Sequence, residues 1–165
     1  MNTGQVILTI GALALLGTTV FNLNQNIGIN NEIVIQSKLG VTAVSLASSL
    51  IEEASGKAFD QATDEDAVSS TSSLTPVANL GLETGEFFPD SVNDFDDYNN
   101  YNSNVSFDRG GTFNIRCKVE YIDPSNPEVA QSSRTWHKKL TVTVTSPDMV
   151  DTIRARYIFS YFYFR

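Results

Sequence analysis

The chain has 165 residues, a formal net charge of −8 and one cysteine, Cys117. A single cysteine excludes an intrachain disulfide and the cysteine clusters of structural zinc and iron–sulfur sites. Eleven of the 19 acidic residues lie between positions 60 and 109, whereas residues 110–165 carry eight basic residues against five acids. This distribution disfavours nucleic-acid binding, which needs a dense positive surface, and favours charge pairing within the chain or between copies of it.

The N-terminal part predicts a membrane anchor over residues 1–24. The first charged side chain is Glu32, and the run Val6–Phe21 contains no ionisable residue. A helix over residues 5–23 would be roughly 28 Å long, which is close to the hydrocarbon thickness of a bilayer. We therefore expect a single-pass membrane helix.

A cleaved signal peptide is the alternative for this segment. Residues 1–4 carry no Lys or Arg, although a signal peptide normally begins with positive charge. Residues 21–26, with the sequence FNLNQN, are bulky and rich in amides, and they provide no small-x-small cleavage site. We therefore expect the segment to be retained.

Residues 25–59 predict an amphipathic continuation of the same helix, although the amide-rich stretch 22–31 is its weakest point. Gly56 is a plausible end for the helix, and Phe59 is expected to close onto the domain. The simplest interpretation is one helix of about 50 residues, apolar first and amphipathic afterwards. The predicted buried stripe consists of Leu39, Ala43, Leu46, Ala47, Leu50 and Ala54.

Residues 60–111 form an acidic region without sustained periodicity, punctuated by Gly, Pro and Ser. A long structureless stretch is unusual inside a compact domain. We therefore expect this region to wrap over the sheet and to contribute one or two short strands, with Ser106–Asp108 as one candidate.

Residues 112–165 predict three antiparallel strands, over 112–122, 136–145 and 153–163, with a turn at DPSNPE (123–128). Cys117 lies on the apolar side of the first alternation, so we interpret it as a core residue. A sheet with one apolar face needs a cover, and the amphipathic helix is available. The predicted fold is α+β, with a long N-terminal helix packed on a C-terminal antiparallel sheet.

Two segments carry a family resemblance. Residues 94–99 (DFDDYN) resemble the DxDDY-type stretch of minor pilins of the mannose-sensitive-haemagglutinin kind, and residues 138–147 (KKLTVTVTSP) are similar to a strand of the same proteins. Together with the predicted architecture, the chain resembles type IV pilins and type II secretion pseudopilins. The resemblance implies a filament subunit that assembles with other pilin or pseudopilin subunits, in the inner membrane with an extracytoplasmic domain or in an extracellular filament.

Members of this family usually lose a short basic leader after a glycine and then carry glutamate at the fifth mature position. The resemblance makes Gly4 the candidate cleavage residue and Gln5 the first mature residue. Thr9 then occupies the fifth position, and the four-residue leader is uncharged. Some tip-type minor pseudopilins also lack the glutamate, so we expect a minor subunit.

Helix packing would then fix the axial register of assembling subunits, because Thr9 offers only a hydroxyl, which usually bonds its own helix backbone. Gly11, Ala12, Ala14 and Gly17 are small enough for close approach of a neighbouring helix, and Ala14 lies three residues from both Gly11 and Gly17. Small residues are also common in membrane helices generally, so both interpretations stay open.

We expect no enzymatic activity and no small-molecule substrate. The one histidine, His137, lies between Trp136 and Lys138 at the start of a predicted strand, without a nucleophile motif nearby. No glycine-rich phosphate loop occurs either, because Gly110-Gly111 precedes a strand rather than a helix.

Calcium is the one metal to consider, because Asp90, Asp94, Asp96 and Asp97 offer the oxygen ligands that it prefers. They do not match the calcium-loop template, since Tyr98 takes its fifth position and Asn99 its sixth. Some pseudopilins bind calcium in C-terminal loops, as the resemblance implies. We nevertheless expect a solvated turn in which these side chains cap backbone amides, with no cofactor, and calcium is the alternative.

The alternative function is a membrane-anchored extracytoplasmic binding or adhesion domain that does not polymerise. The aromatic tail 157–164 could supply an adhesive patch. We expect instead that one side of the tail packs on the helix and the other under the long loop, because large exposed apolar patches are uncommon on soluble monomers.

Overall fold

The structure is a computed structural model that describes residues 2–108 and 110–162. The chain forms two compact units, Met1–Lys38 and Leu39–Arg165, which we describe separately. The helix α1, Thr3–Ser55, contributes to both.

The first unit is the N-terminal part of α1, and every described side chain from residue 2 to residue 35 is exposed. α1 contains an 18-residue window with a mean hydropathy of 2.0, none of which is buried. By length and composition α1 could cross a membrane, and a signal sequence near the N-terminus would have the same properties. The helix continues through residues 22–31 without a break, as predicted.

In the second unit, the C-terminal part of α1 buries the predicted stripe. The stripe faces the core because side chains three or four residues apart lie on one helix face. Beyond the helix end, Phe59 is only 4% exposed, which confirms that it closes onto the domain. The buried helix residues are Leu39, Ala43, Ala47 and Ala54, with Leu46 and Leu50 packed against them.

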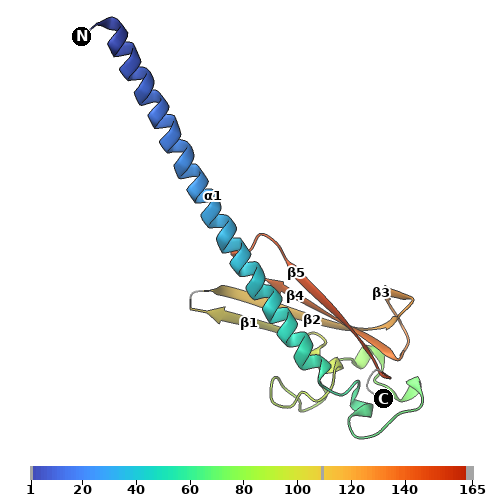
Figure 1. Cartoon of the computed structure of the whole chain (residues 1–165). Helices are drawn as coiled ribbons and strands as arrows, with labels where there is room; N and C mark the ends of the chain where they lie inside the picture. The colour runs from blue at the N-terminus through green and yellow to red at the C-terminus, as the bar shows by residue number, and fades with distance from the viewer. Residues whose placement is uncertain (1, 109, 163–165) are drawn as a thin grey trace. The chain divides into compact units, whose positions relative to one another are not determined.

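An antiparallel sheet lies against this part of the helix (Figure 1). Its main path runs β1-β2-β4-β5, and β3 pairs with the end of β2. The α+β prediction is therefore confirmed. The strands are β1 (Asn102–Phe107), β2 (Gly111–Asp123), β3 (Asn126–Ala130), β4 (His137–Thr145) and β5 (Ile153–Ser160).

The face of the sheet turned towards the helix follows the predicted alternation. On β2 the buried residues include Ile115, Cys117 and Val119, and on β4 they include Leu140 and Val142. Burial raises the pKa of the Cys117 thiol to about 12. The thiolate is the reactive form, so this cysteine behaves as a core residue, as predicted.

The strand predictions need three corrections. The segment 123–128 is only partly a turn. The Asp123 carboxylate accepts the Ser125 N–H at 2.9 Å within the turn, and β3 already begins at Asn126. β1 begins earlier than the candidate Ser106–Asp108. β5 ends at Ser160, and the predicted end at Tyr163 lies outside the described residues.

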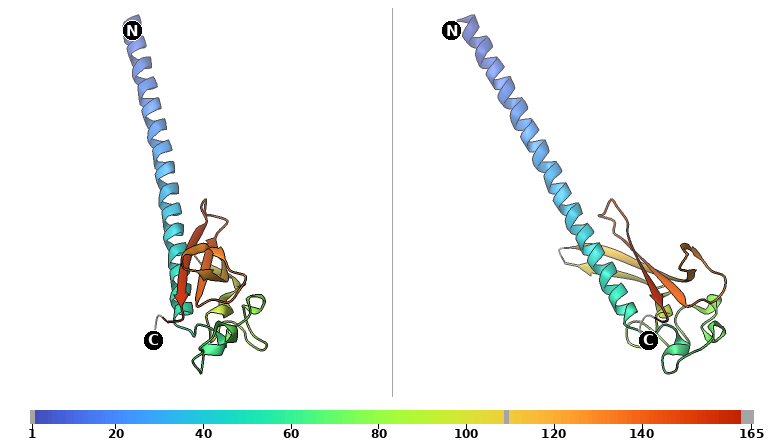
Figure 2. Two further views of the ribbon diagram at one scale, coloured as in Figure 1. Left: turned by 90° about the vertical axis from the view of Figure 1, so that its right-hand side faces the viewer. Right: turned by 45° about the vertical axis from the view of Figure 1, so that its right-hand side comes forward.

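The region between α1 and β1 contains four short 3₁₀ helices. They are η1 (Gln61–Thr63), η2 (Thr71–Ser73), η3 (Val77–Asn79) and η4 (Asp96–Tyr98). Figure 2 shows how the region gathers beyond the end of the helix. Ala58 and Asp94 form a parallel β-bridge, which brings the start of this region next to η4. The segment is thus built into the core and contributes β1, as predicted for one or two strands.

Candidate functional site

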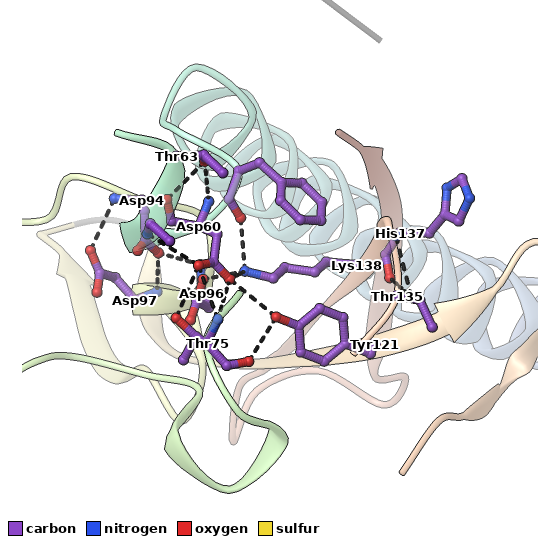
Figure 3. A network of polar contacts seen from close by, with 12 residues as sticks. Asp60, Thr63, Thr75, Asp94, Asp96, Asp97, Tyr121, Thr135, His137 and Lys138 are labelled. Carbon is purple, nitrogen blue, oxygen red and sulfur yellow. Dashed lines mark hydrogen bonds and ion pairs between the residues drawn. The ribbon is translucent and has the colours of Figure 1, made fainter. Parts of the chain in front are cut away.

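A buried lysine, Lys138, is the centre of the main polar network. It follows the alternation of Leu140 and Val142 on β4, so its side chain enters the core, where it is 0% exposed. Its ammonium donates to the carbonyl oxygen of Phe59 at 2.8 Å and to Asp60 Oδ2 at 2.7 Å. It also donates to Asp96 Oδ1 (Figure 3). One side chain thus joins the end of the helical segment, η4 and the sheet.

Asp60 is held from several directions. Its Oδ1 accepts the backbone N–H of Ala62 at 3.2 Å, which caps η1, and the N–H of Thr75 at 3.0 Å. The Tyr121 hydroxyl donates to Oδ2 at 3.1 Å. Burial would raise the pKa of Asp60, but Lys138 and these donors outweigh burial and hold the pKa below its usual value. Asp60 and Lys138 therefore form a buried ion pair.

The DFDDY segment folds into a compact turn. Asp94 Oδ1 accepts the N–H groups of Asp96 at 2.7 Å and Asp97 at 3.2 Å. In return, Asp97 Oδ2 accepts the N–H groups of Asn93 at 3.0 Å and Asp94 at 3.1 Å. The three aspartates are fully buried, so this is not the solvated turn that one interpretation of the sequence offered.

Glu83 and Glu86 join these aspartates in what we call the carboxylate cluster: Glu83, Glu86, Asp94, Asp96 and Asp97. Four of its oxygens are buried without a hydrogen-bond partner, namely Glu83 Oε2, Asp94 Oδ2, Asp96 Oδ2 and Asp97 Oδ1. Burial, together with the neighbouring acids, raises the pKa of Glu83 to about 8 and that of Asp94 to about 9. At neutral pH Glu83 and Asp94 therefore keep their protons in the folded protein, which lowers the negative charge of the cluster.

The structure brings together three of the four aspartates considered for calcium. Asp94, Asp96 and Asp97 share the cluster, whereas Asp90 is exposed and lies outside it. Sequence reasoning missed Glu83 and Lys138. No local motif joins Glu83 to the DFDDY segment, but the position of Lys138 on the apolar side of a predicted strand was a usable signal.

The residues singled out in the N-terminal helix are all exposed. Gly4 and Gln5 lie in the first turns of α1. The Thr9 hydroxyl donates to the carbonyl oxygen of Val6 at 2.9 Å, the backbone bond that we expected. A Cβ atom added at Gly11 would meet nothing within 4 Å. Leader cleavage at Gly4 and close packing by Gly11, Ala14 and Gly17 stay predictions.

His137 lies on the other side of β4 from the network. Its ring points away from Lys138 (Figure 3), and its Nδ1 lies 2.8 Å from the Ser160 hydroxyl. A separate depression of about 830 Å³ has only Glu53 and Tyr101 as titratable lining residues. The absence of enzymatic activity stays a prediction.

In the described part of the aromatic tail, alternate side chains lie on opposite sides of the chain, as predicted. Phe159 and Tyr161 are buried, and Tyr161 stacks on Trp136 with ring centroids 5.0 Å apart. Phe162 is 57% exposed on the other side. Residues 163 and 164 of the proposed adhesive patch lie outside the described residues.

This architecture, a long apolar helix whose C-terminal part packs on an antiparallel sheet, is pilin-like. Comparison with protein-family models, curated proteins and solved structures gives no match for the chain.

Proposed function

We propose that the chain is a minor structural subunit of a type IV pilus-like filament or secretion pseudopilus, without catalytic activity. The pilin-like architecture supports this proposal. The second unit, residues 39–165, which we call the head, has its own apolar core. The N-terminal part of α1 would then interact with lipid or with other subunits.

The observation that carries the proposal is the exposed apolar surface of α1. Large side chains such as Leu8, Leu13 and Leu15 are 66–75% exposed. Apolar surface on this scale is uncommon on soluble monomers and indicates a lipid or protein partner. A subunit that is first stored in the membrane and later packed in a filament would cover the same helix surface in both states.

The proposed assembly relies on packing rather than on charge. The Thr9 hydroxyl already bonds within its own helix, so it supplies no ionic contact between subunits. Gly11, Ala14 and Gly17 leave space along the helix for a neighbouring backbone to approach. Close contacts of this kind would set the axial register.

The test is to determine the N-terminal sequence and intact mass of the native protein in two fractions, sheared surface material and washed membranes. A chain that begins at Gln5 and occurs in the sheared fraction is the expected result. An unprocessed chain found only in membranes would overturn the proposal and favour the anchored binding domain. Comparison with a known filament subunit of the same cells controls for shearing.

A further inference from the structure

We propose that the outer face of the sheet, the side opposite to α1, binds the exposed acidic run Asp64–Asp66 of a second copy of this chain. The inference rests on the proposed function, because it names a contact between the heads of neighbouring subunits. This contact would act in addition to the packing of their N-terminal helices. Both surfaces belong to the same unit of the chain, the head.

Four exposed basic side chains form two rows across the outer face. In the first row, Arg116 on β2 and Arg154 on β5 flank Thr143 on β4. Neighbouring strands lie about 4.8 Å apart, so the two arginines are only about 10 Å apart at the backbone. The second row repeats this pattern two residues along each strand, with Lys118, Thr141 and Arg156.

The first row has no counter-charge in the described part of the chain. Each basic residue of the second row has an acidic partner, at 2.6 Å for Lys118 and at 2.8 Å for Arg156. In contrast, none of the described ion pairs involves Arg116 or Arg154. Like charges that lie this close repel each other, and an anionic partner would remove the repulsion.

The acidic run offers the charge that the first row lacks. It begins where η1 ends, and the Asp60 side chain caps η1, so the start of the run is held in place. The side chains of Asp64, Glu65 and Asp66 are exposed, and none of them takes part in a described ion pair. Three consecutive negative charges are therefore presented to a partner.

The charge complementarity of these two surfaces favours a second copy as the occupant over an acidic polymer. The surfaces are different, so the contact is heterologous and leaves one of each free on a pair of copies. Further copies can then add, as an open filament requires. Helices held in one membrane or filament also raise the effective concentration of the heads, so a few ion pairs can act although each copy carries a net charge of −8.

The test is crosslinking between two differently tagged full-length copies in the membranes of cells that make both. One copy carries Thr143→Cys, in the middle of the first row, and the other carries Glu65→Cys. Cys117 can stay, because it is buried and its thiol is poorly reactive. A short bismaleimide should join these copies with a yield about fivefold higher than when Asp90→Cys replaces Glu65→Cys. Asp90 is an exposed acid outside the run.

Charge reversal distinguishes a specific contact from chance collisions. Arg154→Glu in the first copy should lower the crosslinking yield about fivefold, and so should Asp66→Arg in the second copy. The two reversals together should restore the yield, because the ion pair is remade with opposite polarity. Asp90→Arg in the second copy is the matched control and should leave the yield unchanged.

Equal crosslinking through Glu65→Cys and Asp90→Cys, or reversals that fail to rescue each other, would overturn the proposal. Without a crosslink, retention of the natural chain but not of Arg154→Glu on dextran sulfate beads would assign the face to an acidic polymer instead. A chain that enters sheared filaments without this crosslink would refute the inference alone. A crosslinked pair in membranes, with no chain in sheared material, would refute the filament and leave the contact between heads standing.

Discussion

Lys138 Nζ and Asp60 Oδ2 lie 2.7 Å apart although 78 positions separate the two residues in the sequence. Both side chains are 0% exposed. Asp60 belongs to the segment that follows the helix, and Lys138 belongs to the second half of the sheet. The pair therefore joins two parts of the head that are far apart in the sequence.

Replacing Lys138 by Met should destabilise the head strongly. Asp60 and Asp96 would lose their cation inside the core, and breaking a buried ion pair from one side costs about 3–5 kcal/mol. Denaturant unfolding monitored by Trp136 fluorescence measures the loss. Lys118→Met is the matched control, because the Lys118 side chain is 67% exposed, and it should change stability by less than about 1 kcal/mol. Equal effects of the two substitutions would show that the buried pair contributes little.

The protein should lose stability as the pH rises. Burial, followed by the charge of Asp96, raises the pKa of Asp94 to about 9, with Asp97 acting in the same direction and Lys138 opposing it. The folded chain thus keeps a proton that the unfolded chain releases near the ordinary aspartate pKa of 3.8. Stability from this group is complete below that value and is lost as the pH rises towards about 9.

Melting temperatures at pH 5, 7 and 9 would test this trend. Asp94→Asn should make it less steep, because the amide does not titrate, and the remaining slope comes from Glu83. Asp90→Asn should leave the trend unchanged. A natural chain whose stability increases between pH 5 and 9 would contradict the buried, protonated state of Asp94.

Tyr98→Phe should weaken the link between the helix and η4. The Tyr98 hydroxyl donates to Glu53 Oε1 at 2.8 Å, and the ring is fully buried. Loss of a hydrogen bond to a charged group should cost about 1–3 kcal/mol. The free energy of unfolding of Tyr98→Phe, Glu53→Gln and the double variant would isolate the interaction. Fully additive effects would mean that this hydrogen bond does not contribute.

Ala14→Leu should reduce the amount of the chain in sheared filaments severalfold, because a larger side chain blocks the proposed close approach of a neighbouring helix. Leucine is favourable in a membrane helix, so the amount in membranes should not change. Ala12→Leu is the matched control, since position 12 lies about 160° around the helix from position 14. Equal filament levels for both variants would reject this packing face.

Much of the fold was predictable because it depends on local periodicity. The stripe from Leu39 to Ala54 and the alternation around Cys117 both follow from burial of one face, and the structure contains both. β3 was missed because Pro124 and Pro127 resemble an extended turn, although only two residues separate β2 from β3. Local propensity cannot distinguish such a short hairpin from a loop.

The site was less predictable than the fold. The DFDDY segment is visible in the sequence, but its contact with Lys138 joins residues far apart in the chain, and Glu83 reaches it through a region without periodicity. Lys138 lies two residues from Leu140 on β4, so both side chains are on the same face of the sheet. The alternation of the strand therefore predicts a charged side chain in the core. A lysine on the apolar side of a strand should therefore prompt a search for distant carboxylates.

The buried Lys138 also has a consequence for the order in which the head can form during synthesis. Asp60 and Asp96 emerge from the ribosome before their cation does, and burying them alone would leave two carboxylates without a counter-charge. We therefore expect the region between α1 and β1 to close only after β4 has been made. Until then the acidic region between α1 and β1 would stay unfolded in the nascent chain, although the whole of α1 has already been synthesised.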